Sequence, residues 1–525
     1  MNPDKEILND RLLSDPDRIR QILTPIDRSS TIYPDSIHRT AEYTFLIARL
    51  HDVRQLLIIG ASPDNCGRSG EPASSDDLFA SFSGKTCTLD GLIIKCCPLS
   101  VDNSLQLRKV FPFTNPVALA GRDVTIGLGD RLGLASPGHI RVMKRYKAAP
   151  VLAQQSIREL NLTGATFADV LAAAVWAVFQ EGYADGYGAD GDHLKTAAEV
   201  QLALASGFTM ITLDCSEQID NTVTGLADDE VDARYVLLDP DVRRHYESLY
   251  DNRVIMLDDS VDIRYAPADL KRIVLIYHLA ILHAISIYTR VIKPDERTID
   301  FELSIDETLT ATSPESHYLV AAELIAAGVR ISSLAPRFYG EFQKGVDYRG
   351  NLKRFTAEFD VHARIARHLG YRISVHSGSD KFSVFPIIGS LTGGRFHLKT
   401  AGTNWLEAMC VIAAVHPALY RRMHAYALLH LDEARKYYHV SCDTAQIPAL
   451  DTLTDDELIL YFRQNDSRQL IHITYGLLLQ ARGDDGSWLF RDEFYETLEK
   501  HETEYFDRLI KHIGRHLVAL GLQEA

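Results

Sequence analysis

The chain has 525 residues, of which 46% are hydrophobic and 24% are charged, a balance typical of a globular protein that folds in water. Its formal net charge of −16 and the lack of a basic stripe argue against nucleic acid or an anionic membrane as a partner. No uninterrupted apolar run approaches the ~20 residues that cross a bilayer, and the acidic N-terminus does not resemble a signal peptide. Seven irregularly spaced cysteines favour reduced thiols. We therefore expect a cytoplasmic protein without a membrane or nucleic-acid partner.

The order of predicted elements favours a barrel flanked by two additions. Mixed short strands within residues 1–120 predict an N-terminal α+β capping module. Within residues 121–450, a short β run ending in polar residues alternates eight times with an amphipathic helical segment, which favours a (β/α)8 TIM-type barrel over an open doubly wound sheet. A long helix is expected from about 404 to 440, and residues 451–525 should form a helical C-terminal extension. The eight β runs cover residues 124–130, 150–156, 186–193, 208–214, 299–306, 331–337, 371–377 and 395–400.

Alternation along these strands predicts which side chains enter the barrel. Barrel interiors are normally filled with branched apolar residues, yet several strands here turn carboxylates and basic groups inward. Burying an unpaired carboxylate costs several kcal/mol, so these groups need a cation, a metal or a substrate. The lumen-facing polar residues include Asp190, Asp192, Glu302, Asp306, His376, His397 and Lys399, with His193 at its strand end.

Three histidines, His193, His376 and His397, lie at the ends or interiors of three strands, which favours a metal site over isolated core histidines. Glu341, just past the sixth strand, could complete a histidine–carboxylate shell or be a solvated loop residue. No HExxH or other compact motif is present, so distant loops must assemble the site. Such ligands fit zinc, manganese, iron, cobalt or nickel.

The same strand ends offer acid/base and substrate-binding groups. Asp192 is a candidate acid/base beside a metal, with Glu302 as its opposite partner and Asp306 and Glu307 as rivals. Cations at strand ends could bind a substrate carboxylate or neutralise the lumen acids. These cations are Arg131, Arg337, Lys381 and Lys399, while Gln154, Gln155 and Ser156 could bind sugar hydroxyls and the tyrosines and His439 of the long terminal helix are expected to serve packing.

Seven segments between about residues 125 and 480 carry a family resemblance. They are GLGDRLGLASPGH, VLAQQSIRE, FQEGYADGYGADGDHLK, FELSIDET, ISVHSGSDKFSVFP, FHLKTAGT and RQLIHITYG. In this order they resemble the bacterial tagaturonate epimerases. The resemblance implies a metal-dependent enzyme of galacturonate and glucuronate catabolism that interconverts D-tagaturonate and D-fructuronate. By motif, Asp192 would be the proton acceptor, Glu302 (or Glu307) the proton donor, and His193 and His376 metal ligands, with Glu341 or His397 as the third ligand.

The implied reaction inverts a carbon that lies β to the ketone, so its C–H is not acidic and enolisation cannot invert it. Retro-aldol cleavage followed by re-addition on the other face would do so. Transient oxidation by NAD is the rival route, but GLGDRLG has GxGxxxG spacing and is not a dinucleotide-binding fingerprint. Alternative functions are a metal-dependent sugar-acid aldolase, a ketose isomerase, or a non-catalytic barrel that binds sugar acids.

Overall fold

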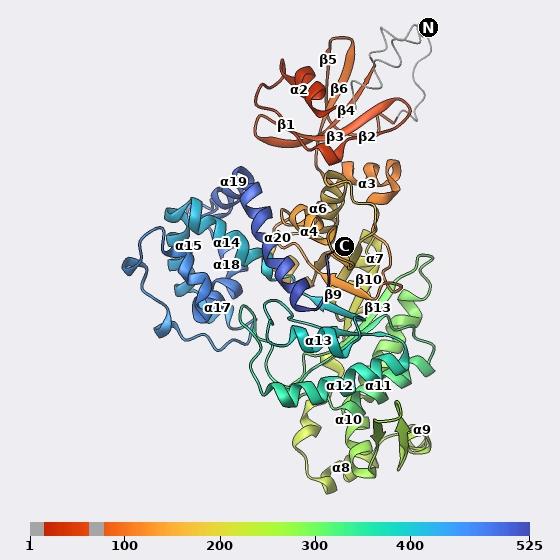
Figure 1. Ribbon diagram of the computed structural model, residues 1–525. Coiled ribbons are helices and arrows are strands. Elements are labelled where there is room, and N and C mark those ends of the chain that lie inside the picture. Colours follow the sequence, from red (N-terminus) through yellow and green to blue (C-terminus); the bar gives the residue numbers. More distant parts are fainter. Residues whose placement is uncertain (1–14, 62–77, 525) are drawn as a thin grey trace. The chain divides into compact units, whose positions relative to one another are not determined.

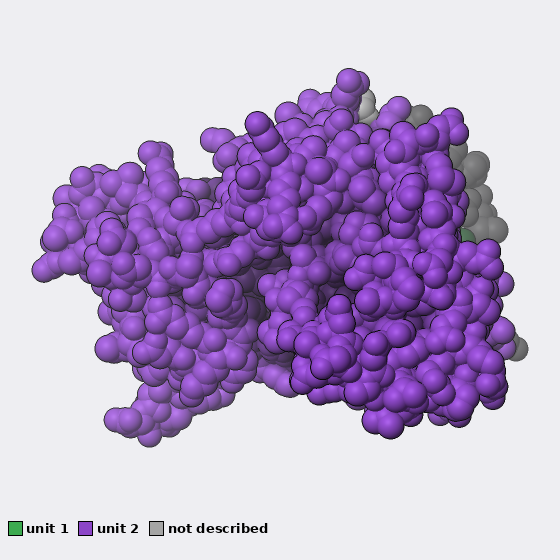
Figure 2. All heavy atoms as spheres, turned by 90° about the horizontal axis from the view of Figure 1, so that it is seen from below, with its two compact units in different colours: residues 1–115, 171–186 green, residues 116–170, 187–525 purple. Residues whose placement is uncertain are grey.

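The computed structural model describes residues 15–61 and 78–524, which divide into two compact units. The smaller unit comprises residues 1–115 and 171–186, and the larger comprises residues 116–170 and 187–525. The larger unit fills most of Figure 2, and the face seen there is hollowed near its middle. The six cysteines within the described ranges are free thiols, while Cys66 lies outside them.

The smaller unit is built on an antiparallel sheet of six strands, with β1, β3, β4, β6 and β5 side by side and β2 paired to β3 (Figure 1). Leu46, Leu57 and Ile94 form its core together with Ile19 from a helix. Helix α6 (Phe167–Gln180) belongs to this unit from Leu171 onward, and the ring of Phe179 lies 5.3 Å from that of Phe111. The elements are α2 (Pro16–Leu23), β1 (Thr31–Ile32), β2 (His38–Arg39), β3 (Tyr43–Leu50), β4 (Val53–Ala61), β5 (Lys85–Leu89), β6 (Leu92–Pro98) and α3 (Val101–Val110).

The larger unit contains a closed barrel of eight parallel strands, which confirms the predicted TIM-type fold. The strand order around the barrel is β10-β13-β14-β15-β16-β7-β8-β9. Each of the eight predicted β runs overlaps one of these strands. They are β7 (Val124–Gly127), β8 (Ala149–Gln155), β9 (Gly188–Leu194), β10 (Met210–Asp214), β13 (Asp300–Ile305), β14 (Ser333–Pro336), β15 (Arg372–Val375) and β16 (Phe396–Lys399).

Well-capped helices follow most barrel strands. Ser156 and Thr196 begin α5 and α7 with capping boxes, in which the hydroxyl accepts from the third backbone N–H and a glutamate returns to the cap. Gly370 ends α12 with φ of 87°, a conformation that costs glycine little. The helices are α4 (Ser136–Met143), α5 (Ile157–Thr163), α6 (Phe167–Gln180), α7 (Ala197–Ser206), α10 (Pro267–Ile287), α11 (Pro314–Ala326), α12 (Leu352–Leu369) and α13 (Phe385–Leu391). An insertion between β10 and α10 adds α8 (Asp228–Tyr235), α9 (Pro240–Tyr250) and the hairpin of β11 (Val254–Met256) and β12 (Asp262–Arg264).

Helix α10 continues through a π-helical turn to Ile292. Among the described helices it alone is long and apolar enough, by length and composition, to cross a membrane. It packs against α8 and α11, and its Lys271 and Arg272 pair with Asp232 and Asp228 at 2.6 and 2.9 Å. These contacts are those of a barrel helix.

The single helix predicted from about 404 to 440 is wrong, because the chain forms three helices there. Pro417 has no N–H to donate and therefore starts a new helix, and the His416 imidazole caps that helix by accepting from the Leu419 N–H at 3.3 Å. Trp405, Met409, Phe494 and Leu509 belong to one core that these helices share with the C-terminal helices, in the blue group of Figure 1. The helices are α14 (Thr403–Val415), α15 (Pro417–Leu429), α16 (Leu431–Ala434), α17 (Asn465–Ile473), α18 (Tyr475–Gln480), α19 (Arg491–Lys500) and α20 (Glu502–Ala519).

Candidate active site

A polar cavity of about 210 Å³ lies at the carboxyl ends of the barrel strands, where TIM-barrel active sites are built. It is smaller than the ~300–1,000 Å³ typical of pockets for larger ligands, so it suits a small substrate. Asp192, His193, Asp306, His376 and Lys399 all contribute to its wall. These five of the predicted strand-end residues therefore lie around one cavity.

An irregularity in β9 turns two consecutive residues toward this cavity. Gly191 pairs with Ile211 and Leu194 with Leu213, so β9 carries one residue more than its neighbour between these pairs. His193 has φ of 51°, in the left-handed region. Because of this bulge, His193 and Asp192 both line the cavity, although regular alternation would send one of them outward.

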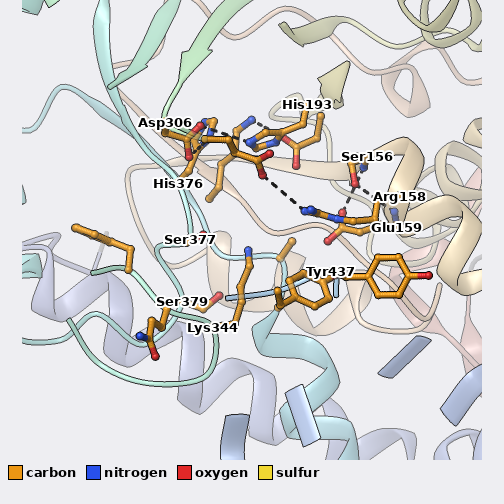
Figure 3. Close-up of a pocket in the computed structure, with 18 of the residues that line it drawn as sticks. Ser156, Arg158, Glu159, His193, Asp306, Lys344, His376, Ser377, Ser379 and Tyr437 are labelled. Carbon is orange, nitrogen blue, oxygen red and sulfur yellow. Dashed lines mark hydrogen bonds and ion pairs between the residues drawn. The ribbon is translucent and has the colours of Figure 1, made fainter. Parts of the chain in front are cut away.

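Three side chains from three strand ends converge on one side of the cavity: His193, Asp306 and His376 (Figure 3). One ligand atom from each lies within 4.8 Å of the others. His376 Nδ1 lies 3.2 Å from Asp306 Oδ2 without a well-directed hydrogen bond, while its Nε2 is 2.7 Å from Glu302 Oε1. A metal-ligating histidine usually has its other nitrogen held by a carboxylate in this way. Two imidazoles and a carboxylate therefore fit a divalent metal ion.

Lys399 is buried among three carboxylates next to this group. Its Nζ lies 2.5 Å from Asp192 Oδ1, 3.0 Å from Asp190 Oδ2 and 2.9 Å from Glu302 Oε1. It also donates to Thr212 Oγ1 at 2.6 Å. Asp192 and Lys399 line the cavity, whereas Glu302 is fully buried and contacts it through Lys399 and His376. One ammonium thus connects an accessible carboxylate with an inaccessible one.

For most of the charged groups in this cluster, ion pairing changes the pKa more than burial does. Burial lowers the pKa of Lys399, but its three carboxylate neighbours raise it well above the usual range. Burial raises the pKa of Asp192, but Lys399 and His193 hold it well below the usual range. Burial dominates at Asp190 and raises its pKa to about 6. Asp192 is therefore an ionised carboxylate in the cavity wall that can accept a proton.

The structure does not bring two of the predicted metal ligands to this group. His397 is fully buried inside the barrel, where its Nδ1 lies 2.8 Å from Thr125 Oγ1 and burial lowers its pKa to about 3. Glu341 is exposed on the loop after β14, where its backbone pairs with Arg349. Asp306, which the sequence offered only as an acid/base rival, takes the third position instead.

The predicted substrate-binding residues Lys381 and Arg337 do not both line the cavity. Lys381 is buried in the cavity wall, but its Nζ donates to the carbonyl oxygens of Gln343, Val346 and Ser379 at 2.7 to 2.9 Å. Lys381 therefore ties two loops together. Arg337 is half-buried outside the cavity lining, and its backbone N–H donates to Thr312 Oγ1.

Gln154 rather than Gln155 reaches the cavity from β8. The register of β8 shifts between Val151 and Ala153, which moves every later side chain to the opposite face. Gln154 is thus the partner of the lumen-facing Asp190.

Several cavity residues were missed or misassigned in the sequence. Arg158 and Lys344 were not selected, although each follows a barrel strand by a few residues, where barrel sites gather their side chains. Tyr437, Tyr438 and His439 were expected to serve packing alone, yet they also line the cavity.

A second histidine–carboxylate cluster, outside the cavity, has all its ligand atoms engaged. His512 lies between two carboxylates, with Nε2 2.5 Å from Asp380 Oδ1 and Nδ1 2.9 Å from Glu407 Oε1. His516 Nε2 accepts the Asp380 N–H at 3.0 Å, and Arg468 Nη2 lies 2.6 Å from Asp380 Oδ2. This cluster is an ion-pair network that ties α20 to the loop after β15.

Comparisons with known proteins identify the family of this chain. The family model for tagaturonate epimerase matches residues 33–520. A tagaturonate/fructuronate epimerase of Thermotoga maritima is 41% identical over 431 residues, covering 82% of this chain and 87% of that protein. Native and glycerol-complexed crystal structures of fructuronate-tagaturonate epimerase from Cohnella laeviribosi share 48% identity and a TM-score of 0.90, covering 97% of this chain and 99% of those chains. The chain therefore belongs to the tagaturonate epimerase family and is an epimerase of the isomerase class.

Proposed function

We propose that this protein interconverts D-tagaturonate and D-fructuronate in the cytoplasm, as a divalent-metal-dependent step of hexuronate catabolism. The observation that carries the proposal is the His193–Asp306–His376 group beside the Asp192–Lys399 pair in one small polar cavity. The substrate pair is that named for the relatives from Thermotoga maritima and Cohnella laeviribosi.

His193, His376 and Asp306 would hold the metal ion. When bound, such an ion supplies Lewis-acid stabilisation of negative charge on the substrate's carbonyl oxygen, typically several kcal/mol. Nitrogen and carboxylate ligands together suit zinc, manganese, iron, cobalt or nickel. Glu302 orients His376 through its 2.7 Å contact with Nε2.

Asp192 acts as the base on the hydroxyl of the carbon that is inverted. Removal of that proton allows the adjacent carbon–carbon bond to break in the retro-aldol direction, giving an aldehyde and an enediolate. The aldehyde turns its other face, and the bond re-forms with inverted configuration. Lys399, which contacts both Asp192 and Glu302, supports proton transfer between the two carboxylates. Glu302, which is ionised at rest, takes up through Lys399 the proton that Asp192 removes, and it returns this proton when the bond re-forms, whereas Glu307 lies on the cavity wall itself.

Proton NMR of D-tagaturonate incubated with metal-loaded protein tests the proposal, with EDTA-treated protein as the control. Appearance of D-fructuronate only with metal supports it. Accumulation of three-carbon fragments would favour the aldolase alternative, because the bond would then break without re-forming. An unchanged spectrum with metal-loaded protein would contradict the proposal.

Asp192→Asn separates the base from the metal site. The variant should retain bound metal, measured by mass spectrometry, and lose turnover by about 10²–10⁴-fold. Near-normal turnover would reject Asp192 as the base. His376→Ala should instead lose metal and activity together.

A further inference from the structure

We propose that Arg158 and Lys344 form a binding site for the carboxylate of the sugar acid, on the wall of the cavity away from the His193–Asp306–His376 group (Figure 3). This inference rests on the proposed function, which supplies a substrate with a carboxylate at one end. It also replaces the strand-end cations that the sequence first offered for this role.

Arg158 presents a guanidinium whose pairing is incomplete. Its Nε is buried and makes no hydrogen bond, and its nearest carboxylate oxygen, Glu307 Oε1, is 3.9 Å from Nη2. The guanidinium lies 5.0 Å from the centre of the Tyr438 ring, which holds its plane in place. A planar fork of this kind matches a carboxylate.

Lys344 extends into the same cavity from the loop after β14 (Figure 3). No hydrogen bond or ion pair joins its Nζ to any other residue in the described ranges. Burial, followed by the positive charges of Arg131 and Arg158, lowers its pKa. An anion between Lys344 and Arg158 would relieve this repulsion and replace the lost solvent.

The other cations of the cavity already have partners. Arg131 Nη2 lies 2.5 Å from Glu159 Oε1, and its guanidinium lies 4.3 Å from the Tyr475 ring centre. Lys381 is held by three backbone carbonyls, and Lys399 by three carboxylates. Arg131 also has two buried nitrogens, Nε and Nη1, without a hydrogen bond, but Glu159 at 2.5 Å balances its charge. Among the lysines and arginines of the cavity wall, Arg158 and Lys344 have no carboxylate oxygen closer than 3.9 Å in the described ranges.

This placement assigns the two ends of the substrate. The carboxylate binds Arg158 and Lys344, and the ketone end faces His193, Asp306 and His376. The carbon that is inverted lies between these ends of the chain. The charge pair would thus select sugar acids over neutral ketoses.

Equilibrium titration with D-tagaturonate and with D-tagatose tests the assignment, because D-tagatose carries a hydroxymethyl group where D-tagaturonate carries the carboxylate. Titrations in an Asp192→Asn background avoid turnover, so binding is read even if the proposed reaction is wrong. Lys344→Gln and Arg158→Gln should each weaken D-tagaturonate binding at least tenfold. D-tagatose binding should change less than twofold, and Lys344→Arg should restore most of the D-tagaturonate affinity.

Lys353→Gln is the matched control, because Lys353 is an exposed lysine of α12 outside the cavity lining. It should leave both affinities unchanged. Equal weakening of both ligands, unchanged D-tagaturonate binding, or failure of Lys344→Arg to rescue would overturn the assignment. Conversion of D-tagaturonate by Lys344→Gln with an unchanged KM would also overturn it, while leaving the proposed reaction intact.

Discussion

His512→Gln should destabilise the larger unit in a pH-dependent way. Burial lowers the pKa of this imidazole, but Asp380 and Glu407 outweigh burial and raise the pKa from its ordinary value of 6.5 to about 10. A difference of one between the folded and unfolded pKa values corresponds to about 1.4 kcal/mol. The ion pairs of His512 therefore contribute at most about 5 kcal/mol to the free energy of unfolding. The side chain is only 12% exposed, so solvent screens the pair little. Arg468 still pairs with Asp380 in the variant, so we expect a loss of about 3–5 kcal/mol near pH 6.

The sign of the pH dependence follows from the raised pKa. A group whose pKa is higher in the folded state contributes its full stability below the unfolded pKa, here about 6.5, and loses it as pH rises through about 10. Wild-type and variant proteins should therefore differ most near pH 6. Near pH 10 the difference should shrink to less than about 1 kcal/mol.

Thermal unfolding followed by circular dichroism measures this effect. The unfolding entropy of a unit of roughly 400 residues is ~0.8 kcal/mol/K, so 3–5 kcal/mol lowers Tm by about 4–6 °C. His501→Gln, at the start of the same helix, is the control and should shift Tm by about 1 °C or less at either pH. A Tm difference that is constant between pH 6 and 10, or that grows with pH, would refute the assignment of His512 as an ion-paired imidazolium.

Four further predictions concern the cavity. Lys399→Met should lower the stability of the larger unit by about 3–5 kcal/mol and abolish turnover, because it removes the one cation that three buried carboxylates share; an unchanged Tm would contradict this. Asp306→Asn should lose bound metal in parallel with activity, and full metal content by mass spectrometry would remove it from the ligand set. Glu302→Gln should reduce kcat far more than Glu307→Gln, and steady-state kinetics showing the reverse would transfer the donor role to Glu307. His193→Gly should be about 1 kcal/mol more stable than His193→Ala in metal-free melts, because φ of 51° strains alanine; equal stability would mean that the bulge rearranges.

The alternation of side chains along the strands predicted which residues face the inside of the barrel, because successive residues of a strand point to opposite faces. Glu302 and Lys399 lie on the faces assigned from the sequence and meet in the barrel at 2.9 Å. The helix break at Pro417 was missed, although its signal is present in the sequence, because proline cannot donate a backbone hydrogen bond. In these cases the deciding physics is local.

The hydrogen-bond and ion-pair partners of the loop lysines could not be predicted from the sequence, because they lie on loops that meet only in the folded chain. Lys381 bonds carbonyl oxygens that are 38 and 35 residues away in sequence, so its role as a tie between loops has no local signature. Lys344 shows the opposite case, since its ammonium enters the cavity without a partner in the described ranges. Both residues are lysines in loops after barrel strands, and only the fold distinguishes them.

The regular inward–outward alternation of side chains is interrupted in the neighbouring strands β8 and β9, and this interruption shapes the candidate active site. β8 and β9 each contain a register shift, so the barrel is irregular on the side that supplies Gln154, Asp192 and His193. A regular β9 could turn only one of Asp192 and His193 into the lumen. The extra residue lets a proposed base and a proposed metal ligand stand side by side, with Asp192 Oδ1 2.9 Å from His193 Nδ1. This contact places the carboxylate of the proposed base at the edge of the His193–Asp306–His376 group, which is the arrangement that the proposed reaction requires.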